Sequence, residues 1–126
     1  MFTIIFPVLN ERLRLENGVT RTVEYLQSIA FEDYEIIIVD NGSEDETPQI
    51  AEKLCKKYDK VKYERINVRG VGAAFRRGVE VSHGDVVGYM DIDLSTNIRH
   101  LGEAIHLFGT QPEIQYINGS RFARES

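Results

Sequence analysis

Residues 35–43 read Glu-Ile-Ile-Ile-Val-Asp-Asn-Gly-Ser, and this stretch decides the fold class. The run at 35–39 is apolar on both of the faces that a strand presents, which is typical of a central strand in a parallel sheet. A polar sequence with the composition of a turn follows at 40–43. Thr47 and Pro48 then suit the N-cap and the first residue of a helix. The stretch therefore predicts one strand–turn–helix unit of an α/β protein.

The same pattern continues on both sides of this unit. Apolar runs predict further strands at 2–8, 61–66, 85–90 and 114–118, and helical spacing predicts helices at 17–30, 71–82 and 97–108. Gly84 and Gly109 are expected to end the last two helices, Gly84 in the left-handed conformation. Strands separated by helices should be parallel near-neighbours joined by right-handed crossovers. We therefore predict one α/β domain over residues 1–126, with three layers and an open, mainly parallel sheet covered on both faces.

The composition limits the classes of protein to which the chain can belong. Its 126 residues are 42% hydrophobic and 28% charged, as in an ordinary globular domain, and its net charge is −5. Binding of duplex nucleic acid needs a basic face, so we expect no nucleic-acid partner. Cys55 is the single cysteine and cannot form an internal disulfide, which indicates a reducing compartment and a cytoplasmic protein. No apolar run approaches the ~20 residues that span a bilayer.

Polar residues gather just after each predicted strand. Ligands of open α/β sheets bind beyond the carboxyl ends of the strands, so these residues are expected to face one crevice. The polar segments are 10–11, 40–43, 67–72, 91–93 and 119–121.

Asp91 and Asp93 are the residues in these segments that point most directly to chemistry. Residues two apart in an extended segment point the same way, so the two carboxylates repel one another unless a cation lies between them. Oxygen ligands without His or Cys select Mg²⁺ or Mn²⁺, and an ion held in this way can also bind a diphosphate. The alternative is a solvated loop that happens to contain two acids.

Two acids at the other strand ends each allow two interpretations. Asp40 can accept hydrogen bonds from a nucleobase or a ribose, or it can close an Asx-turn in which Gly42 has a positive φ. Glu11 can contact a nucleotide, or it can pair with Arg12 or Arg14 on the surface.

The remaining polar segments are open to two interpretations as well. Residues 69–74, with Arg69 and Gly72, begin a helix, whose backbone could approach an anion or could pack closely on the sheet. Arg121 could bind a phosphate through its guanidinium, or it could be a solvated side chain.

Five segments in order resemble the inverting family 2 glycosyltransferases of the GT-A, Rossmann-like fold, which transfer sugars from nucleoside diphosphates. They are 7–11, 39–43 with Asp45 and Thr47, 67–73, 91–93 and 119–121. Within that family, 10–12 and 119–122 are similar to the synthases that load a sugar onto a polyprenyl phosphate such as dolichyl phosphate. The resemblance implies that Asp91 and Asp93 handle the metal and the diphosphate, and that Arg121 meets a phosphate. It also implies four nucleoside contacts, at Pro7, Leu9, Glu11 and Asp40.

Departures from the family pattern refine these expectations. Asn41 stands where Asp is commonest, so no role is assigned to its side chain. Ser95 and Thr96 look more like the glucose-transferring type than the mannose-transferring type, which favours UDP-glucose over GDP-mannose as the donor.

The resemblance also implies that 1–126 is the donor-binding, N-terminal part of a longer domain. We expect it to bind a nucleotide sugar, to transfer the sugar to a polyprenyl phosphate slowly or not at all, and to self-associate through an uncovered surface. The longer protein is expected at the cytoplasmic face of a membrane.

Three other functions are alternatives to this one. A non-catalytic nucleotide-binding module would bind the donor without turnover. A phosphorelay receiver domain needs adjacent acids after the first strand and a lysine after the last, where this chain has Asn10-Glu11 and Arg121. A dinucleotide-dependent oxidoreductase needs a glycine fingerprint after the first strand, and this chain lacks one.

Overall fold

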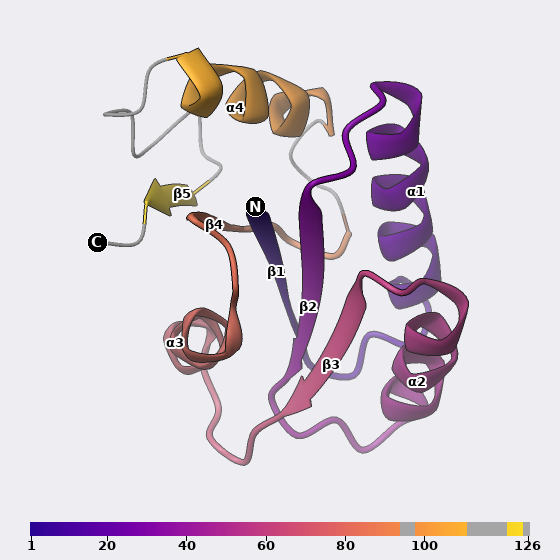
Figure 1. The fold of residues 1–126 in the computed structure, drawn as a ribbon. Helices are drawn as coiled ribbons and strands as arrows, with labels where there is room; N and C mark the ends of the chain where they lie inside the picture. The colour runs from indigo at the N-terminus through magenta and orange to yellow at the C-terminus, as the bar shows by residue number, and fades with distance from the viewer. Residues whose placement is uncertain (94–97, 111–120, 125–126) are drawn as a thin grey trace.

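A computed structural model describes residues 1–93, 98–110 and 121–124 of the chain. For Val71, 107–110 and 121–124 the description is of the backbone. The elements in chain order are β1 (Phe2–Val8), α1 (Leu15–Ser28), β2 (Tyr34–Asp40), α2 (Thr47–Lys57), β3 (Val61–Arg65), α3 (Val71–Val81), β4 (Val86–Tyr89), α4 (Arg99–Thr110) and β5 (Arg121–Arg124). The strands form one sheet in the order β3-β2-β1-β4-β5 (Figure 1).

The centre of the sheet is formed by β1 and β2, as their apolar sequences predict. They pair in parallel, with Ile4 beside Ile36 and Val8 beside Asp40, and all seven residues of β2 are buried. β3 and β4 flank this pair, also in parallel. Complete burial of an isoleucine, valine or phenylalanine side chain contributes ~1.5–3 kcal/mol to stability. Because β1 and β2 bury many such side chains, this central pair is a main source of the stability of the fold.

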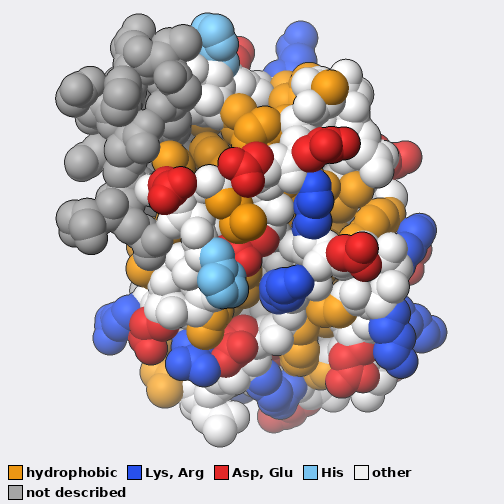
Figure 2. Space-filling view, in the orientation of Figure 1, with side chains coloured by type: hydrophobic (Ala, Val, Ile, Leu, Met, Phe, Trp, Pro, Cys, Tyr) orange, Lys and Arg blue, Asp and Glu red, His pale blue; other side chains and the backbone are white. Residues whose placement is uncertain are grey.

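Helices cover both faces of the sheet, which confirms the predicted three-layer α/β architecture. Alternate residues such as Ile4 and Ile36 pack with residues of α1, α2 and α4 in one hydrophobic cluster. The residues between them, such as Ile5 and Ile37, pack on α3 in a second, smaller cluster. Figure 1 shows α1 and α2 on one side of the strands and α3 on the other. On the face shown in Figure 2, acidic, basic and apolar side chains are intermixed.

Two predicted helix ends are wrong. α3 ends at Val81 with Ser82 in an extended conformation, and Gly84 does not have a positive φ. Gly84 is needed for space instead, because a Cβ there would lie 2.9 Å from the carbonyl oxygen of Met1 and closer still to Thr3 Oγ1. α4 continues to Thr110, so Gly109 lies inside the helix rather than at its end.

The far edge of the sheet also differs from expectation. The strand predicted at 114–118 lies outside the described residues. The strand that is described there, β5, runs antiparallel to β4, with Arg121 beside Tyr89. The sheet is therefore mainly parallel with one antiparallel edge strand. Among the described residues, no helix is both long enough and apolar enough to cross a membrane.

Candidate functional site

The end of β2 is closed by a hydrogen-bonded turn centred on Asp40. Its carboxylate is completely buried, and Oδ1 accepts hydrogen bonds from the backbone N–H groups of Gly42 (3.0 Å) and Ser43 (2.7 Å). Gly42 has φ +97°, a conformation that a side chain would strain. The Asx-turn interpretation of Asp40 is therefore confirmed.

The second carboxylate oxygen of Asp40 is engaged by the neighbouring strand. Tyr63 donates its hydroxyl to Oδ2 at 2.6 Å, and Arg65, which lies beside Asp40 in the sheet, approaches Oδ2 at 3.5 Å. Burial, and then the hydrogen bond to Asp40, raises the pKa of Tyr63 to about 12. A nucleoside could reach this carboxylate only by displacing one of these partners.

Asn41 has a structural role that the sequence did not suggest. The residue is buried, and its amide Nδ2 donates to the carbonyl oxygens of Val68 (2.9 Å) and Gly70 (3.1 Å). The side chain thus fixes the loop before α3, where Gly70 has φ +117°. Aspartate, which is commonest at this position in the family that the sequence resembles, could not donate these bonds. The asparagine at position 41 was therefore the signal in the sequence that could have predicted this role.

The loop that Asn41 holds presents the predicted anion-binding residues. Arg69 and Gly72 are both exposed, at the start of α3. A Cβ on Gly72 would meet no atom within 4 Å, so this glycine is not required for close packing. Close packing occurs instead at Gly78, where a Cβ would lie 2.8 Å from Cγ1 of Ile5. The start of α3 therefore stays open to a ligand.

The end of β1 is tied to the start of α2. Asn10 N–H donates to Ser43 Oγ at 2.8 Å, and Glu11 N–H donates to Thr47 Oγ1 at 2.9 Å. The sequence predicted that Thr47 is the N-cap of its helix, and this is wrong. Thr47 is the first residue of α2 and its hydroxyl accepts a bond from the loop after β1, whereas the N-cap is Glu46. These bonds hold the first two strand ends together.

The predicted nucleoside residues of β1 lie along this braced segment. Pro7 and Leu9 are half-buried, and Pro7 lies beside Val39 of β2. The Glu11 carboxylate lies 3.4 Å from the guanidinium of Arg14, which is one of the two surface pairs considered for it.

The two acids after β4 are placed quite differently from Asp40. Asp91 and Asp93 are both exposed, whereas Ile92 between them is only 4% exposed and packs into the larger core cluster. Ile92 and Asp93 lie in a turn, so the extended geometry assumed from the sequence is wrong. The two acids instead lie on either side of a residue that is buried.

The chemistry of this pair suits a divalent cation that the protein shares with a ligand. The described residues contain no cluster of three or more His, Cys, Asp or Glu that could enclose a metal. Mg²⁺ does not need such a cage, because it binds through one or two carboxylates and completes its coordination with water and phosphate oxygens. Asp91 and Asp93 supply that number of carboxylates.

Arg121 begins β5, and its backbone lies beside Tyr89 at the carboxyl end of β4. Because β5 is antiparallel, its first residue lies at the same edge of the sheet as the ends of the parallel strands. The structure therefore brings the backbone positions of all nine predicted site residues to this edge: Pro7, Leu9, Glu11, Asp40, Arg69, Gly72, Asp91, Asp93 and Arg121. Gly119, Ser120, Ser95 and Thr96 lie outside the described residues.

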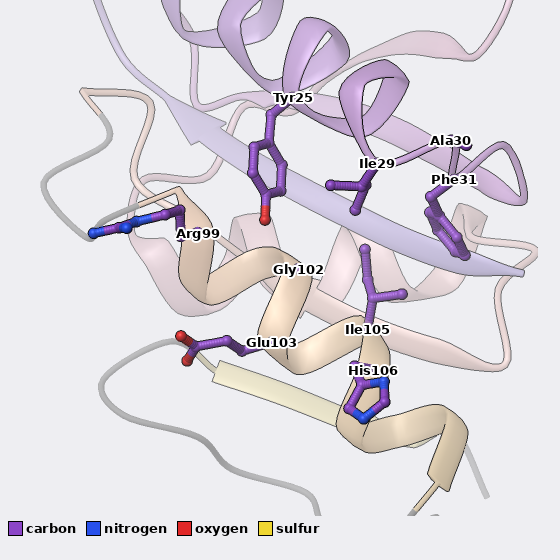
Figure 3. A pocket seen from close by; sticks show the side chains of 9 residues that line it. All are labelled: Tyr25, Ile29, Ala30, Phe31, Arg99, Gly102, Glu103, Ile105 and His106. Carbon is purple, nitrogen blue, oxygen red and sulfur yellow. The ribbon is translucent and has the colours of Figure 1, made fainter.

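A groove of about 860 Å³ lies elsewhere, between the end of α1 and α4 (Figure 3). Tyr25 of α1 and Ile29, the residue directly after α1, face Gly102 and Ile105 of α4 across it. Phe31 also lines the groove and precedes the start of β2, so the groove lies toward the amino end of that strand. It is therefore separate from the strand ends that carry the predicted site.

The chain is similar to known glycosyltransferases. The model of the family described as "Glycosyl transferase family 2" matches residues 3–123. Glycosyltransferase AglD of Haloferax volcanii is 38% identical over 105 residues, which cover 82% of this chain and 17% of that protein. The dolichyl-phosphate beta-glucosyltransferase of Mus musculus is 37% identical over 101 residues, covering 75% of this chain and 31% of the relative.

A solved structure shares the fold. The mannosyltransferase PcManGT from Pyrobaculum calidifontis, in complex with GDP-Man and Mn²⁺, matches with a TM-score of 0.70 at 22% identity, over 85% of this chain and 32% of that one. The predicted GT-A fold is thereby confirmed. The chain spans less than a third of each of these three proteins.

Proposed function

The chain belongs to glycosyl transferase family 2, and from this premise we propose that it binds a nucleoside-diphosphate sugar together with Mg²⁺ or Mn²⁺ at the carboxyl edge of its sheet. In the longer protein, the sugar passes with inversion to a polyprenyl phosphate. One observation carries the proposal: after β4, two exposed carboxylates flank a buried isoleucine.

Each group at this edge has a part in the proposal. Asp91 and Asp93 hold the ion, which when bound neutralises charge on the departing nucleoside diphosphate. The start of α3, with Arg69 and Gly72, and Arg121 on β5 lie where they can meet phosphates. Pro7, Leu9 and Glu11 line the braced end of β1 for the nucleoside.

Asp40 has a structural role in the proposal, without a ligand bond of its own. Its carboxylate fixes the turn and orients Tyr63 and Arg65, and Arg65 is 43% exposed and also donates to the carbonyl of Ser43 at 3.0 Å. A direct contact between Asp40 and the nucleoside remains a prediction from the family resemblance.

The proposed acceptor needs little help from a general base. A phosphate monoester is anionic at neutral pH, with a second pKa near ~6. One of its oxygens attacks the anomeric carbon as the bond from that carbon to the diphosphate breaks, which inverts the configuration and releases the nucleoside diphosphate. The dolichyl-phosphate glucosyltransferase relative supports this class of acceptor.

The donor sugar is proposed to be glucose, carried on UDP. Ser95 and Thr96 favour it, and so does the name of the mouse relative. GDP-mannose is the alternative, because the Pyrobaculum calidifontis enzyme was solved with that donor. A thermal-shift panel of UDP, GDP and their sugar conjugates tests the choice, because a ligand that binds only the folded protein raises its melting temperature.

A non-catalytic nucleotide-binding module is the second candidate, favoured by the small share of each relative that this chain spans. Transfer of radiolabelled sugar to a short polyprenyl phosphate separates the two functions. We expect turnover by the longer protein and little or none by residues 1–126. Donor binding without turnover by both proteins would support the module instead.

Two properties of the protein in the cell are also proposed. The single cysteine supports a cytoplasmic location. In the longer protein we propose a location at the cytoplasmic face of a membrane, and cell fractionation tests both. β3 forms one edge of the sheet, which supports self-association through that edge, and light scattering tests it.

A further inference from the structure

Helix α1 touches the segment that carries the two exposed acids, and the contact point is a glycine. Gly18 is buried in the first turns of α1. A Cβ built on Gly18 would lie 2.8 Å from Cδ1 of Ile92 and closer still to the carbonyl oxygen of Ile92. Real Cβ atoms essentially never approach other atoms within 3.0 Å. Any side chain at position 18 must therefore displace the backbone of Ile92, not merely its flexible end.

The position of Ile92 determines where both acids lie. It is the middle residue of the Asp91–Asp93 segment, and its side chain is buried in the cluster that contains Leu15 and Val19 of α1. Its carbonyl faces α1, while its two neighbours are exposed. A shift of the Ile92 backbone is consequently transmitted to the acid on each side.

The carbonyl group of Gly18, opposite Ile92, has a side-chain partner within α1. Thr22 is fully buried and donates its hydroxyl to that carbonyl oxygen at 2.8 Å. The close approach of Ile92 therefore leaves this carbonyl group hydrogen-bonded.

We infer that Gly18 and Ile92 are positioning residues that set the spacing and direction of the Asp91 and Asp93 carboxylates. The inference rests on the proposed function of these acids as a shared metal site. Mg²⁺ requires near-octahedral geometry with oxygens at ~2.0–2.1 Å, and functional groups must be held within ~0.5 Å of their working positions. The close packing of α1 on Ile92 supplies that constraint from behind the site.

Ordinary helix–sheet packing is the competing explanation, and Gly78 provides a matched control. It is also a buried helical glycine, but it lies in α3 on the opposite face of the sheet. A Cβ there would lie 2.8 Å from Cγ1 of Ile5, and the nearest atoms that it meets all belong to the Ile5 side chain, on the face of the sheet opposite to Ile92. Gly78→Ala therefore reproduces the loss of packing space but crowds a side chain on the α3 face, not the backbone between the two acids.

The test compares Gly18→Ala, Gly78→Ala and the unsubstituted 126-residue protein. Calorimetry measures the Kd of UDP and of GDP with saturating Mn²⁺ and with EDTA, at a temperature at which circular dichroism shows each protein folded. We expect Gly18→Ala to weaken Mn²⁺-dependent binding about tenfold or more and to leave binding in EDTA unchanged. Gly78→Ala should lower Tm and leave both Kd values unchanged.

Ile92→Val keeps the test decisive if Gly18→Ala does not fold. This variant loosens the anchor without creating a clash, and a severalfold loss of Mn²⁺-dependent binding is expected. Two results overturn the positioning inference and leave the proposed metal site standing. One is unchanged Mn²⁺-dependent binding in the folded Gly18→Ala or Ile92→Val protein, and the other is an equal loss of that binding in Gly78→Ala. An unsubstituted protein that binds equally well in Mn²⁺ and EDTA overturns the proposed metal site, and the inference with it.

Discussion

The ends of β2 and β4 both carry aspartates at the same edge of one sheet, yet the two strands use them in opposite ways. Asp40 is completely buried, and its carboxylate has two backbone donors, a tyrosine hydroxyl and an arginine as partners. Asp91 and Asp93 are exposed on either side of a buried isoleucine. The same residue type is thus a structural brace at one strand end and a candidate ligand at the other.

The neighbouring strands explain this difference. β2 lies between β1 and β3, and β3 places Tyr63 and Arg65 against the Asp40 carboxylate. β4 is short and ends at Tyr89, and in the described part of the turn after it the buried residue, Ile92, faces α1. An acid at a strand end is therefore buried where the adjacent strand packs side chains against it, and exposed where the residue next to it in sequence is the one that is buried.

The largest effect that tests this contrast is expected from Asp40→Ala. The change leaves the Tyr63 hydroxyl and the turn N–H groups without their acceptor, and removal of one partner from a buried charged network costs about 3–5 kcal/mol. Urea unfolding should show a loss of that order, while the folded fraction still binds nucleotide normally. Weak nucleotide binding by folded Asp40→Ala, with and without metal alike, would show that Asp40 reads the nucleoside.

Asp93→Asn should give the reverse result. The amide keeps the shape of the side chain but removes one anionic ligand, and Mn²⁺-dependent nucleotide binding should weaken by roughly 10- to 100-fold, or ~1.4–2.7 kcal/mol. The free energy of unfolding should change by less than about 0.5 kcal/mol, because the residue is exposed. A variant that loses stability but binds normally would place Asp93 in the same class as Asp40.

Asn41→Asp probes the residue that follows the brace. A carboxylate cannot donate to the carbonyl oxygens of Val68 and Gly70, and the lost bonds should cost about 1–3 kcal/mol. Hydrogen exchange should increase in the loop before α3, and Asn41→Ala should behave similarly. Unaltered exchange there would show that the loop holds its shape without the amide.

A fourth acid, Glu35, extends the comparison to the opposite end of β2. Burial raises the pKa of Glu35, but hydrogen bonds from the His83 N–H and the Thr3 hydroxyl outweigh it, and the pKa is lowered overall. Folding thus favours the ionised form. Its contribution to stability is present above the unfolded-state pKa, near ~4.3, and is lost as the pH falls through the folded-state pKa.

Glu35→Gln removes this carboxylate and serves as the control for its pH-dependent contribution to stability, which is the smallest effect expected here. The difference in free energy of unfolding between the two proteins should be larger at pH 7 than at pH 3, as measured by urea titration. A difference that does not change with pH would contradict the assignment to Glu35.

The sequence predicts the parts of the fold that depend on local periodicity. β1 spans the predicted residues 2–8, and the elements from α1 to α4 match expectation apart from shifts at their ends. β5 was not predicted, because Arg121 was expected to follow the last strand and instead begins one. The helix ends predicted at Gly84 and Gly109 were wrong for two different reasons. Gly84 is required for space rather than for a left-handed turn, and Gly109 is tolerated inside a helix. The antiparallel direction of β5 depends on pairing with β4, which periodicity does not report.

The sequence predicts that the polar segments lie at one edge of the sheet, but not which of their acids are buried and which are exposed. The polar strand ends do share one edge, because parallel strands align their carboxyl ends. The side-chain partners of Asp40 come from β3, more than twenty residues away, and no local sequence pattern predicts them. The contact between Gly18 and Ile92 joins residues still farther apart in sequence, through helix packing that only the folded chain displays.

The central claim is that Asp91 and Asp93 form a metal-dependent nucleotide site, and calorimetry of UDP and GDP binding tests it most directly. The 126-residue protein and its Asp91→Asn/Asp93→Asn double variant are each titrated in Mn²⁺ and in EDTA. The account predicts that one of the two nucleotides binds the unsubstituted protein at least about tenfold more tightly in Mn²⁺, a gain of ~1.4 kcal/mol, and that the double variant loses this gain. Equal affinity in Mn²⁺ and EDTA for both nucleotides, or a gain that survives in the double variant, would contradict it.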